Sequence, residues 1–435
     1  MYRIPLSCIL CFYYSLTFAG APPATDNYLV RCNEKLVEVI MEDIFNPAVA
    51  SRVQVYPNIA AYEVLCKKNK TIHSLCKQLN QLETIADPAG KVDYSLSALI
   101  AFTTVAKRLV YSEYMITDFE NIEFTRWLAA HHNDTSLLNS SVEYGKSVAG
   151  NIIAWMKKDN YDYTRTLSRY VLTNEPGAWQ PTGPEYMNAL EPNWQLMRSF
   201  VFDSSNYVKA IPNVAYSEKK NSLYYKNAMK LYRQSVKSDA SKKLIASYWD
   251  DNPNILKSGG HLSYFVHKVG PGGHWIRIAG QAIKNLQLDE FKAAKIYTMV
   301  TLALYEGFIS CWIEKYFSNA MRPETYINRL ISPTWKSFIE TPPFPEYTSG
   351  HSVISSAAAT VLMALIPQPY SFTDSSEMYI NLPARRFKSF RAAANEASIS
   401  RFYGGIHYMP ALDNGIKQGM DVGNFLLRKL KLAEQ

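Results

Sequence analysis

The sequence predicts an all-α protein, a large helical bundle, and three observations support this prediction. Apolar residues recur at helical spacing in several long segments, turn-forming residues gather between those segments, and patterns typical of β-strands are sparse. The chain has 435 residues, of which 47% are hydrophobic and 19% charged. Because both fractions are ordinary for globular proteins, the chain has enough apolar side chains to fill a large core.

The N-terminal half contains four segments with the helical pattern. The first, residues 28–45, has apolar side chains at Leu29, Leu36 and Ile40, and it ends before Pro47. The other segments are 96–111, 141–157 and 222–249, and turn formers such as Asn174-Glu-Pro-Gly lie between them.

The C-terminal half begins with the longest predicted helix, residues 289–319. Its Leu, Met, Phe and Trp residues cover much of its circumference, so we expect it to be buried between other helices. Pro323 ends or kinks this helix and disfavours helical geometry at Arg322. A proline-rich loop follows, and further helices are predicted at 353–365, 389–402 and 420–430.

These segments divide the chain into three parts. They are a signal peptide at 1–20, an N-terminal helical region at 21–280 and a helical core at 281–435. The core contains the candidate functional residues described below. No clear linker separates the two helical parts, so we expect them to pack together.

The first twenty residues have the pattern of an export signal. Arg3 precedes a largely apolar run that ends in small residues, with cleavage expected after Ala19. No later run reaches 18 uninterrupted apolar residues, so the sequence predicts no stable membrane span. We therefore expect a soluble, exported protein, periplasmic or extracellular.

The charge balance argues against a nucleic-acid partner. The net charge of +8 is a mild bias on a chain of 435 residues, and no block of five or more Lys or Arg residues occurs. A surface that attracts small anions fits this charge, and so does simple solubility.

Four cysteines remain after removal of the signal peptide, and none forms a Cys-x-x-Cys pair. A structural zinc site is therefore not expected. Cys66 and Cys76 are the nearest pair for a disulfide in an oxidising compartment, and free buried thiols are an equal alternative. The four are Cys32, Cys66, Cys76 and Cys311.

Two cations follow each other at helical spacing near the end of the long predicted helix. Lys315 and Arg322 lie seven residues apart, which is close to two full turns, so both side chains would project from one helix face. They could bracket one polyanion there. A solvated cationic stripe, or pairing with Glu314 and Glu324, is the alternative.

A second motif, Ser349-Gly350-His351, comes directly before an apolar helix. Ser349 or Ser352 can cap that helix, and Gly350 allows close approach of the backbone to a ligand. The free N–H groups of the first turn favour an anion. His351 would be a proton donor or acceptor at that end, unless the segment is an ordinary cap with a surface histidine.

A third motif places Arg401 at the end of a predicted helix and His407 after Gly404-Gly405. The glycines indicate a backbone that bends sharply and aims the imidazole. A helix C-cap with a core histidine is the alternative.

Taken together, the three motifs resemble the signature of the type 2 phosphatidic acid phosphatase / vanadium-dependent haloperoxidase superfamily. The resemblance includes Pro323 and covers roughly the last third of the chain. The long helical N-terminal half is similar to the soluble haloperoxidase branch rather than to the small membrane phosphatases. The stretch Pro345-Glu-Tyr-Thr-Ser-Gly-His351 is also similar to the Pro-x-Tyr-Pro-Ser-Gly-His of haloperoxidases.

The resemblance implies a role for each motif residue. His407 would bond the central atom of the oxyanion, as the protein ligand of vanadium or as the nucleophile of a phosphatase. His351 would be the acid–base residue. The remaining residues would hold the oxygens of vanadate or phosphate, by charge or by hydrogen bonds; they are Lys315, Arg322, Arg401, Ser349 and Gly350.

This sequence departs from the superfamily pattern at two positions. Thr348 replaces the usual proline before Ser-Gly-His. Ala411 stands where an aspartate usually orients the last histidine. Asp413 could substitute after a turn at Pro410, or a backbone carbonyl could hold the imidazole. Outside the motifs, the glycine-rich segment around His274 would either line the mouth of the site or form a tight turn between the two helical parts.

Three functions follow from these motifs. The first is a vanadate-dependent haloperoxidase that oxidises halide with hydrogen peroxide. The second is an exported soluble acid phosphatase that acts on a phosphomonoester through a phosphohistidine, with no cofactor. The third is a phosphate- or oxyanion-binding protein without catalysis. The sequence leaves the oligomeric state open.

Overall fold

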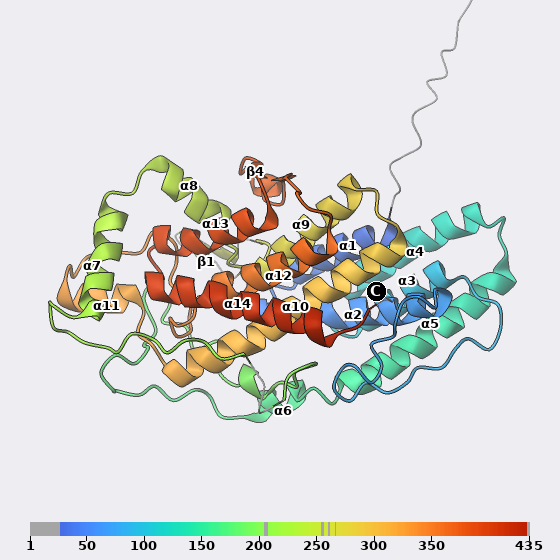
Figure 1. Cartoon of the computed structure of the whole chain (residues 1–435), viewed down its shortest axis with the longest axis horizontal. Helices are drawn as coiled ribbons and strands as arrows, with labels where there is room; N and C mark the ends of the chain where they lie inside the picture. The colour runs from blue at the N-terminus through green and yellow to red at the C-terminus, as the bar shows by residue number, and fades with distance from the viewer. Residues whose placement is uncertain (1–26, 204–207, 254–255, 260–261, 266, 433–435) are drawn as a thin grey trace, which may run out of the picture.

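The structure is a computed structural model that describes residues 27–203, 208–253, 256–259, 262–265 and 267–432. Within these ranges it contains fourteen α-helices, two short 3₁₀ turns and four short strands (Figure 1). The predicted all-α class is confirmed. The predicted signal peptide lies outside the described residues, and it stays a prediction.

Six helices form the N-terminal part. Every residue from Ala48 to Cys66 of α2 is buried, so this helix shows no alternation between apolar and polar faces, and the sequence analysis missed it. The six are α1 (Tyr28–Glu42), α2 (Pro47–Lys68), α3 (Tyr94–Lys107), α4 (Glu113–Ala130), α5 (Thr135–Met156) and α6 (Tyr161–Thr166).

The middle of the chain differs from the prediction in two places. The single helix predicted at 222–249 is wrong, because Asp239 caps a second helix by accepting from the Lys242 N–H at 2.9 Å. The glycine-rich segment before Trp275 is the first turn of a helix and not a loop. The middle elements are η1 (Trp194–Leu196), α7 (Leu223–Val236), α8 (Ala240–Tyr248), β1 (Leu256–Gly259), β2 (Leu262–Phe265) and α9 (Pro271–Asn285).

The C-terminal part is built around α10 (Glu290–Ser318), close to the predicted bounds. In Figure 1 this helix runs through the middle of the molecule, and it contacts both α2 and α12. The last helix begins at Met409, earlier than predicted, because Pro410 starts it and does not form a separate turn. The other elements are α11 (Pro323–Leu330), α12 (Gly350–Leu365), β3 (Phe372–Asp374), η2 (Met378–Ile380), β4 (Arg385–Phe387), α13 (Phe390–Tyr403) and α14 (Met409–Lys429).

The four strands form two small antiparallel hairpins. β1 pairs with β2 so that Leu256 faces Phe265, and β3 pairs with β4 so that Phe372 faces Phe387. The second hairpin contacts α9 and α13, and it brings Asp374 next to the first turn of α9.

One continuous apolar core joins the N-terminal and C-terminal helices, from Leu29 in α1 to Leu432 after α14. Within the described residues, α10 is the one helix long and apolar enough to cross a membrane. However, 94% of its most apolar window is buried against other parts of the protein. That burial is typical of the central helix of a bundle.

The prediction that Lys315 and Arg322 share one helix face is wrong. The long helix ends at Ser318, and Asn319 takes a left-handed conformation with φ of 44°. Arg322 is the extended residue that precedes α11, with ψ of 151°. The two cations therefore reach the site from the end of α10 and from the turn that follows it.

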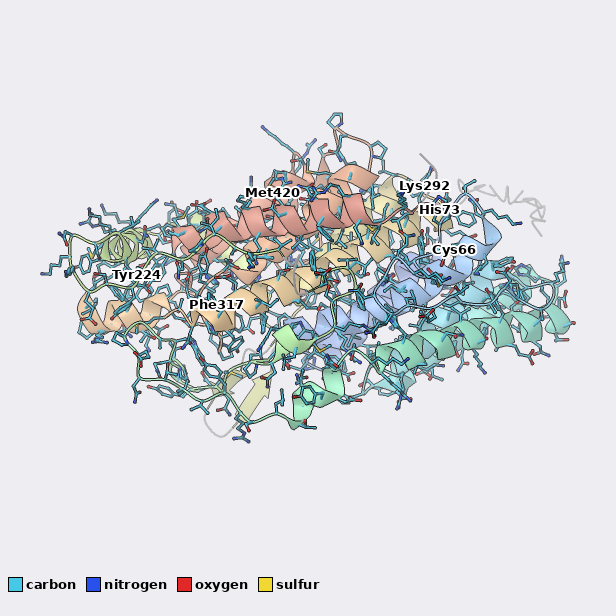
Figure 2. The ribbon with its side chains drawn as sticks, turned by 60° about the horizontal axis from the view of Figure 1, so that its bottom comes forward. Cys66, His73, Tyr224, Lys292, Phe317 and Met420 are labelled. Carbon is cyan, nitrogen blue, oxygen red and sulfur yellow. The ribbon has the colours of Figure 1, made fainter. Side chains whose placement is uncertain are left out.

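All four described cysteines are free thiols. Cys66 lies on α2 and is labelled in Figure 2. Its Sγ and that of Cys76 both lie near the same Glu63 oxygen, at 3.9 and 3.3 Å. Burial and this carboxylate raise the pKa of Cys76 to about 11, so the thiol stays protonated at neutral pH.

Candidate active site

His407 lies where the chain turns from α13 into α14. Gly405 has φ of +85°, a conformation that favours glycine. The N–H of Ile406 donates back to the Arg401 carbonyl at 3.1 Å and closes the turn. The predicted sharp bend at the glycines is therefore confirmed, and it delivers His407 into the protein interior, where the side chain is 4% exposed.

Two neighbours define the tautomer of His407. Nδ1 lies 3.0 Å from Oε1 of Glu346, and Nε2 lies 3.1 Å from Nη1 of Arg322. A carboxylate accepts and a guanidinium only donates. Nδ1 therefore carries the proton, and Nε2 presents its lone pair on the side of Arg322.

The surroundings keep the His407 ring neutral. Burial, followed by the charges of Arg322, Lys315 and Arg401, holds its pKa well below the usual value for histidine. Three cations therefore act on one ring, and Arg322 lies directly against Nε2. A neutral imidazole beside clustered cations can donate its lone pair to an electrophilic centre while the cations hold negative oxygens.

Glu346 is a site residue that the sequence analysis missed. Its Oε1 also accepts from the Tyr408 N–H at 3.0 Å, so one oxygen fixes both the ring and the backbone of this turn. Burial raises the Glu346 pKa to about 7, against the pull of Arg322. The sequence does contain a sign of this role, because Glu346 is an acidic residue inside the haloperoxidase-like motif, at the variable position of Pro-x-Tyr.

The predicted substitution of Asp413 for the missing aspartate is wrong. Asp413 is an exposed residue in the first turns of α14, whereas the ring it would orient is held by Glu346. Ala411 is buried, and its carbonyl accepts from the Ser349 N–H at 3.1 Å. Through this hydrogen bond, the backbone of Ala411 joins the Ser349 motif to the segment that follows His407.

Arg322 is fully buried, and backbone carbonyls orient it. Nε donates to the Phe344 carbonyl at 2.8 Å, and Nη1 donates to that of Ile406 at 3.0 Å. Nη2 has no hydrogen-bond partner among the described residues. A guanidinium held on two sides with one nitrogen left over is suited to bind an oxyanion.

Lys315 is also fully buried, but its ammonium faces the loop that leads into the second motif. Nζ donates to the carbonyls of Pro345 and Thr348 at 2.9 and 2.5 Å and approaches that of Glu346 at 3.3 Å. Burial lowers its pKa to about 7. An anion bound nearby would raise that pKa and so favour the charged form.

Arg401 enters from the last turn of α13. Its Nη1 donates to the Trp249 carbonyl at 2.6 Å, and its Nε has no hydrogen-bond partner among the described residues. Burial lowers the pKa of this guanidinium, and the carboxylates of Asp250 and Asp251 act in the opposite direction. Those two residues follow α8, so carboxylates from the middle of the chain partly offset the positive charge of Arg401.

The second motif forms the N-terminus of α12, as predicted. Ser349 is the N-cap, and its Oγ accepts from the Ser352 N–H at 3.4 Å. A Cβ added to Gly350 would meet only Trp312, at 3.9 Å. The space beside the Gly350 backbone is therefore open to a ligand rather than filled by packing.

His351 follows in the first turn of α12, with 14% of its side chain exposed. Its Nε2 lies 3.4 Å from Oδ2 of Asp251 and has no well-directed hydrogen bond to a described residue. Burial and the charge of Arg401 lower the His351 pKa to about 4, although Asp251 opposes the shift. The ring is therefore neutral at physiological pH.

His274 does not line the mouth of the site, and that prediction is wrong. The residue is completely buried in the first turn of α9. Its two ring nitrogens contact Asp251 and Asp374. It lies behind His351, separated from it by Asp251.

Three buried nitrogens at the site lack a hydrogen-bond partner among the described residues: Arg322 Nη2, Arg401 Nε and His351 Nε2. An unsatisfied buried donor costs about 1–3 kcal/mol, so a ligand with several acceptor oxygens would stabilise the two guanidinium nitrogens, whereas His351 Nε2 faces Asp251. The neutral Nε2 of His407 and the open space at Gly350 complete the arrangement. The site is suited to hold a tetrahedral or bipyramidal oxyanion whose central atom faces His407.

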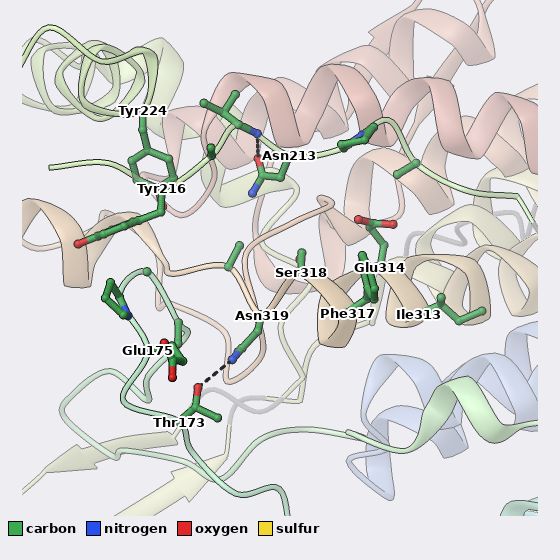
Figure 3. Close-up of a pocket in the computed structure, with 18 of the residues that line it drawn as sticks. Thr173, Glu175, Asn213, Tyr216, Tyr224, Ile313, Glu314, Phe317, Ser318 and Asn319 are labelled. Carbon is green, nitrogen blue, oxygen red and sulfur yellow. Dashed lines mark hydrogen bonds between the residues drawn. The ribbon is translucent and has the colours of Figure 1, made fainter. Parts of the chain in front are cut away.

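A separate cavity of about 880 Å³ opens beside the C-terminal end of α10 (Figure 3). Tyr216, Tyr224 and Phe317 give it an aromatic lining. None of the predicted oxyanion ligands lines it. It adjoins the site through Ala320, whose carbonyl accepts from the Glu346 N–H at 2.9 Å.

Comparisons with known proteins agree with this arrangement. Residues 295–433 match the family model of the VCPO second helical-bundle domain. A bacterial vanadium-dependent iodoperoxidase structure is 41% identical, with a TM-score of 0.87 over 94% of this chain and 97% of that chain. The holo and apo structures of a bacterial vanadium-dependent chloroperoxidase are 16% and 17% identical, with TM-scores of 0.69 and 0.68 over 94% of this chain and 99% of theirs. No curated protein matches the chain by sequence.

Proposed function

Because this chain belongs to the vanadium-dependent haloperoxidase family, we propose that it is an iodoperoxidase, with vanadate bound at His407. The family assignment rests on the 41% identity over 94% of the chain. Iodide is favoured as the substrate because the similar structure is that of an iodoperoxidase, whereas the chloroperoxidases share the fold at only 16% and 17% identity. Iodide is also the most easily oxidised of the three common halides.

The observation that carries this proposal is the surroundings of His407. Its Nδ1–H is held by Glu346, its Nε2 lone pair faces Arg322, and the buried cations Lys315 and Arg401 also act on the ring. Arg322 Nη2 and Arg401 Nε are the free donors for vanadate oxygens. Ser349 and the Gly350 N–H would add hydrogen bonds at the helix N-terminus, and Lys315 would add charge.

Bound vanadate supplies a Lewis-acidic centre that activates hydrogen peroxide for two-electron oxidation of a halide. The net reaction is H₂O₂ + I⁻ + H⁺ → HOI + H₂O, so protons must be moved as well as electrons. The cations of the site disperse the negative charge of the oxygens. The fixed tautomer of His407 leaves Nε2 without a proton, so its lone pair can pass from Arg322 Nη1 to the bound group.

His351 is the acid–base residue of this proposal. It is neutral at physiological pH, so it can accept a proton from hydrogen peroxide, and it can return that proton to the water that leaves. Its neighbour Asp251 stabilises the protonated ring by its charge. The ring thus has an anion on one side and the oxyanion site on the other.

The pH dependence of the enzyme follows from the shifted pKa of His351. Since burial and Arg401 lower that pKa to about 4, the base form persists as pH falls through the ordinary histidine value of about 6.5. We expect kcat/KM for hydrogen peroxide to hold over that range and then to fall below about pH 4, by about tenfold per pH unit. The measurement uses enzyme saturated with vanadate. A midpoint near the ordinary histidine value would contradict this role for His351.

Halide oxidation by the reconstituted protein tests the proposed function. Protein stripped of oxyanions is assayed with hydrogen peroxide and iodide, bromide or chloride, with and without vanadate. We expect triiodide formation only with vanadate, and kcat/KM for iodide at least about tenfold above that for bromide, a difference of about 1.4 kcal/mol. Hydrolysis of p-nitrophenyl phosphate is measured in parallel. Equal rates with bromide would overturn the iodide preference, and phosphate release without halide oxidation would overturn the function.

A further inference from the structure

A cluster of buried charged side chains lies behind His351, outside the oxyanion site. His274 is at its centre, with three carboxylates around the ring. The cluster joins three separate elements, because His274 comes from α9, Asp251 follows α8, and Asp374 ends β3. None of its members has a role in the function proposed above except Asp251.

The contacts of His274 define its protonation. Nδ1 lies 3.1 Å from Oδ1 of Asp251, and Nε2 lies 2.8 Å from Oδ2 of Asp374. Since a carboxylate only accepts, each ring nitrogen must carry a proton. His274 is therefore an imidazolium between two anions.

The ring of His274 is also fixed in its plane. The Trp249 indole stacks on it with centroids 4.4 Å apart and an interplanar angle of 17°. A Cβ added to Gly273, the preceding residue, would lie 2.7 Å from a Val269 methyl group, so this turn of α9 is tightly packed. A charged ring held by stacking and by two hydrogen bonds is a rigid donor.

Asp251 connects this ring to the acid–base histidine. Its Oδ1 accepts from His274, and its Oδ2 lies 3.4 Å from Nε2 of His351. Although burial alone would raise it, the charge of His274 and its hydrogen bond to Asp251, with a contribution from His351, hold the Asp251 pKa below its usual value. Burial likewise opposes the charge of His274, but Asp251 and Asp374 raise its pKa well above the usual value.

We propose that His274 is a positioning residue for catalysis: anchored by Asp374, it holds Asp251 in the orientation in which the second Asp251 oxygen faces His351. The inference rests on the acid–base role proposed for His351. His274 thereby joins the pair formed by Asp251 and His351, and the contacts run in the order His274, Asp251, His351. Outer partners of this kind orient the group that touches the substrate, and their loss commonly reduces activity about 10–100-fold.

Two substitutions of His274 separate positioning from packing. The amide nitrogen of Asn occupies roughly the place of Nδ1, and that of Gln roughly the place of Nε2. His274→Asn therefore keeps the donor to Asp251, and His274→Gln keeps only the donor to Asp374. Both remove the positive charge, so they are matched in charge and polarity. Thermal unfolding of both variants checks that each is folded.

We expect the two variants to differ in kcat. His274→Asn should stay within about fivefold of the wild type, whereas His274→Gln should lose about tenfold or more, with KM for iodide little changed in both. Conservation of vanadate affinity in both variants would show that the oxyanion site is intact. Equal losses in the two variants would mean that His274 acts through packing or charge alone, and would overturn the proposal.

A second readout does not depend on the loaded enzyme. The ring of His351 is titrated by NMR in vanadate-free protein labelled at histidine. The charged groups that act on this ring are Asp251, Arg401 and His274, and those around His274 include Glu377. Loss of the His274 charge raises the His351 pKa in both variants, but only Asn keeps Asp251 in place. We expect a higher His351 pKa in His274→Asn than in His274→Gln, and equal values would contradict the proposal.

Metal analysis of the purified protein tests the competing occupant of the cluster. Asp251, His274 and Glu377 place one ligand atom each within 4.8 Å of the others, so a divalent cation is the alternative to a proton on Nδ1. We expect no stoichiometric divalent cation, and one equivalent that disappears in Glu377→Gln would overturn the proposal.

If wild-type protein fails to oxidise halide with vanadate, the proposed function fails. The NMR comparison would still decide whether His274 positions Asp251.

Discussion

Replacement of His407 by alanine should abolish vanadate-dependent iodide oxidation while the protein stays folded. His407 offers the neutral lone pair that faces Arg322, whereas the arginines and the backbone N–H groups can only donate. We expect vanadate affinity to fall at least about 100-fold and the peroxidase rate by about 10³ or more. Calorimetry with vanadate and triiodide formation at saturating iodide are the measurements.

Phosphate binding and a surface histidine provide the controls for His407→Ala. The cations that hold phosphate remain in this variant, so we expect phosphate affinity within about fivefold of the wild type. His267→Ala, at a histidine with 44% side-chain exposure, should retain full activity. If His407→Ala binds vanadate as tightly as the wild type does, His407 is not the vanadium ligand.

Loss of Glu346 should weaken vanadate binding, although Glu346 contacts Nδ1 of His407 and not Nε2, the proposed vanadium ligand. Glu346→Ala leaves two buried N–H groups without an acceptor, that of His407 Nδ1 and that of the Tyr408 backbone. We expect vanadate affinity to fall about 10–100-fold. We also expect the free energy of unfolding to fall by about 1–3 kcal/mol, because buried donors become unsatisfied.

Glu346→Gln is the matched variant, since its amide oxygen can still accept both hydrogen bonds. The wild-type Glu346 pKa is raised to about 7 by burial, so a neutral side chain resembles a form already populated at neutral pH. We expect this variant to bind vanadate within about tenfold of the wild type. Vanadate affinity at the wild-type level in Glu346→Ala would show that something else orients His407.

Much of the candidate site could be predicted from the sequence because its residues lie in three short motifs at helix ends. The caps and breaks there are local: Ser349 caps α12, and Gly405 allows the bend before His407. The partner of His407 was not local. Glu346 is 61 residues away along the chain, whereas Asp413 is the acid that lies near Ala411 in the sequence.

Helix boundaries were less predictable than helix existence. Residues 289–319 were expected as one buried helix, and α10 has nearly those bounds. The uniformly buried α2 has no polar face, so periodicity could not reveal it. The three glycines before His274 are typical of a turn, yet Pro271 starts a helix there.

A crystal structure of the protein with vanadate bound tests the central claim most directly. That claim is that the Nε2 of His407 is the protein ligand of vanadium, with Glu346 fixing its tautomer. The predicted result is vanadium within bonding distance of Nε2, with its oxygens in contact with Arg322 Nη2 and Arg401 Nε, and with the Glu346 contact retained. Vanadium bound elsewhere, or in the same place but held only through its oxygens, would contradict the account.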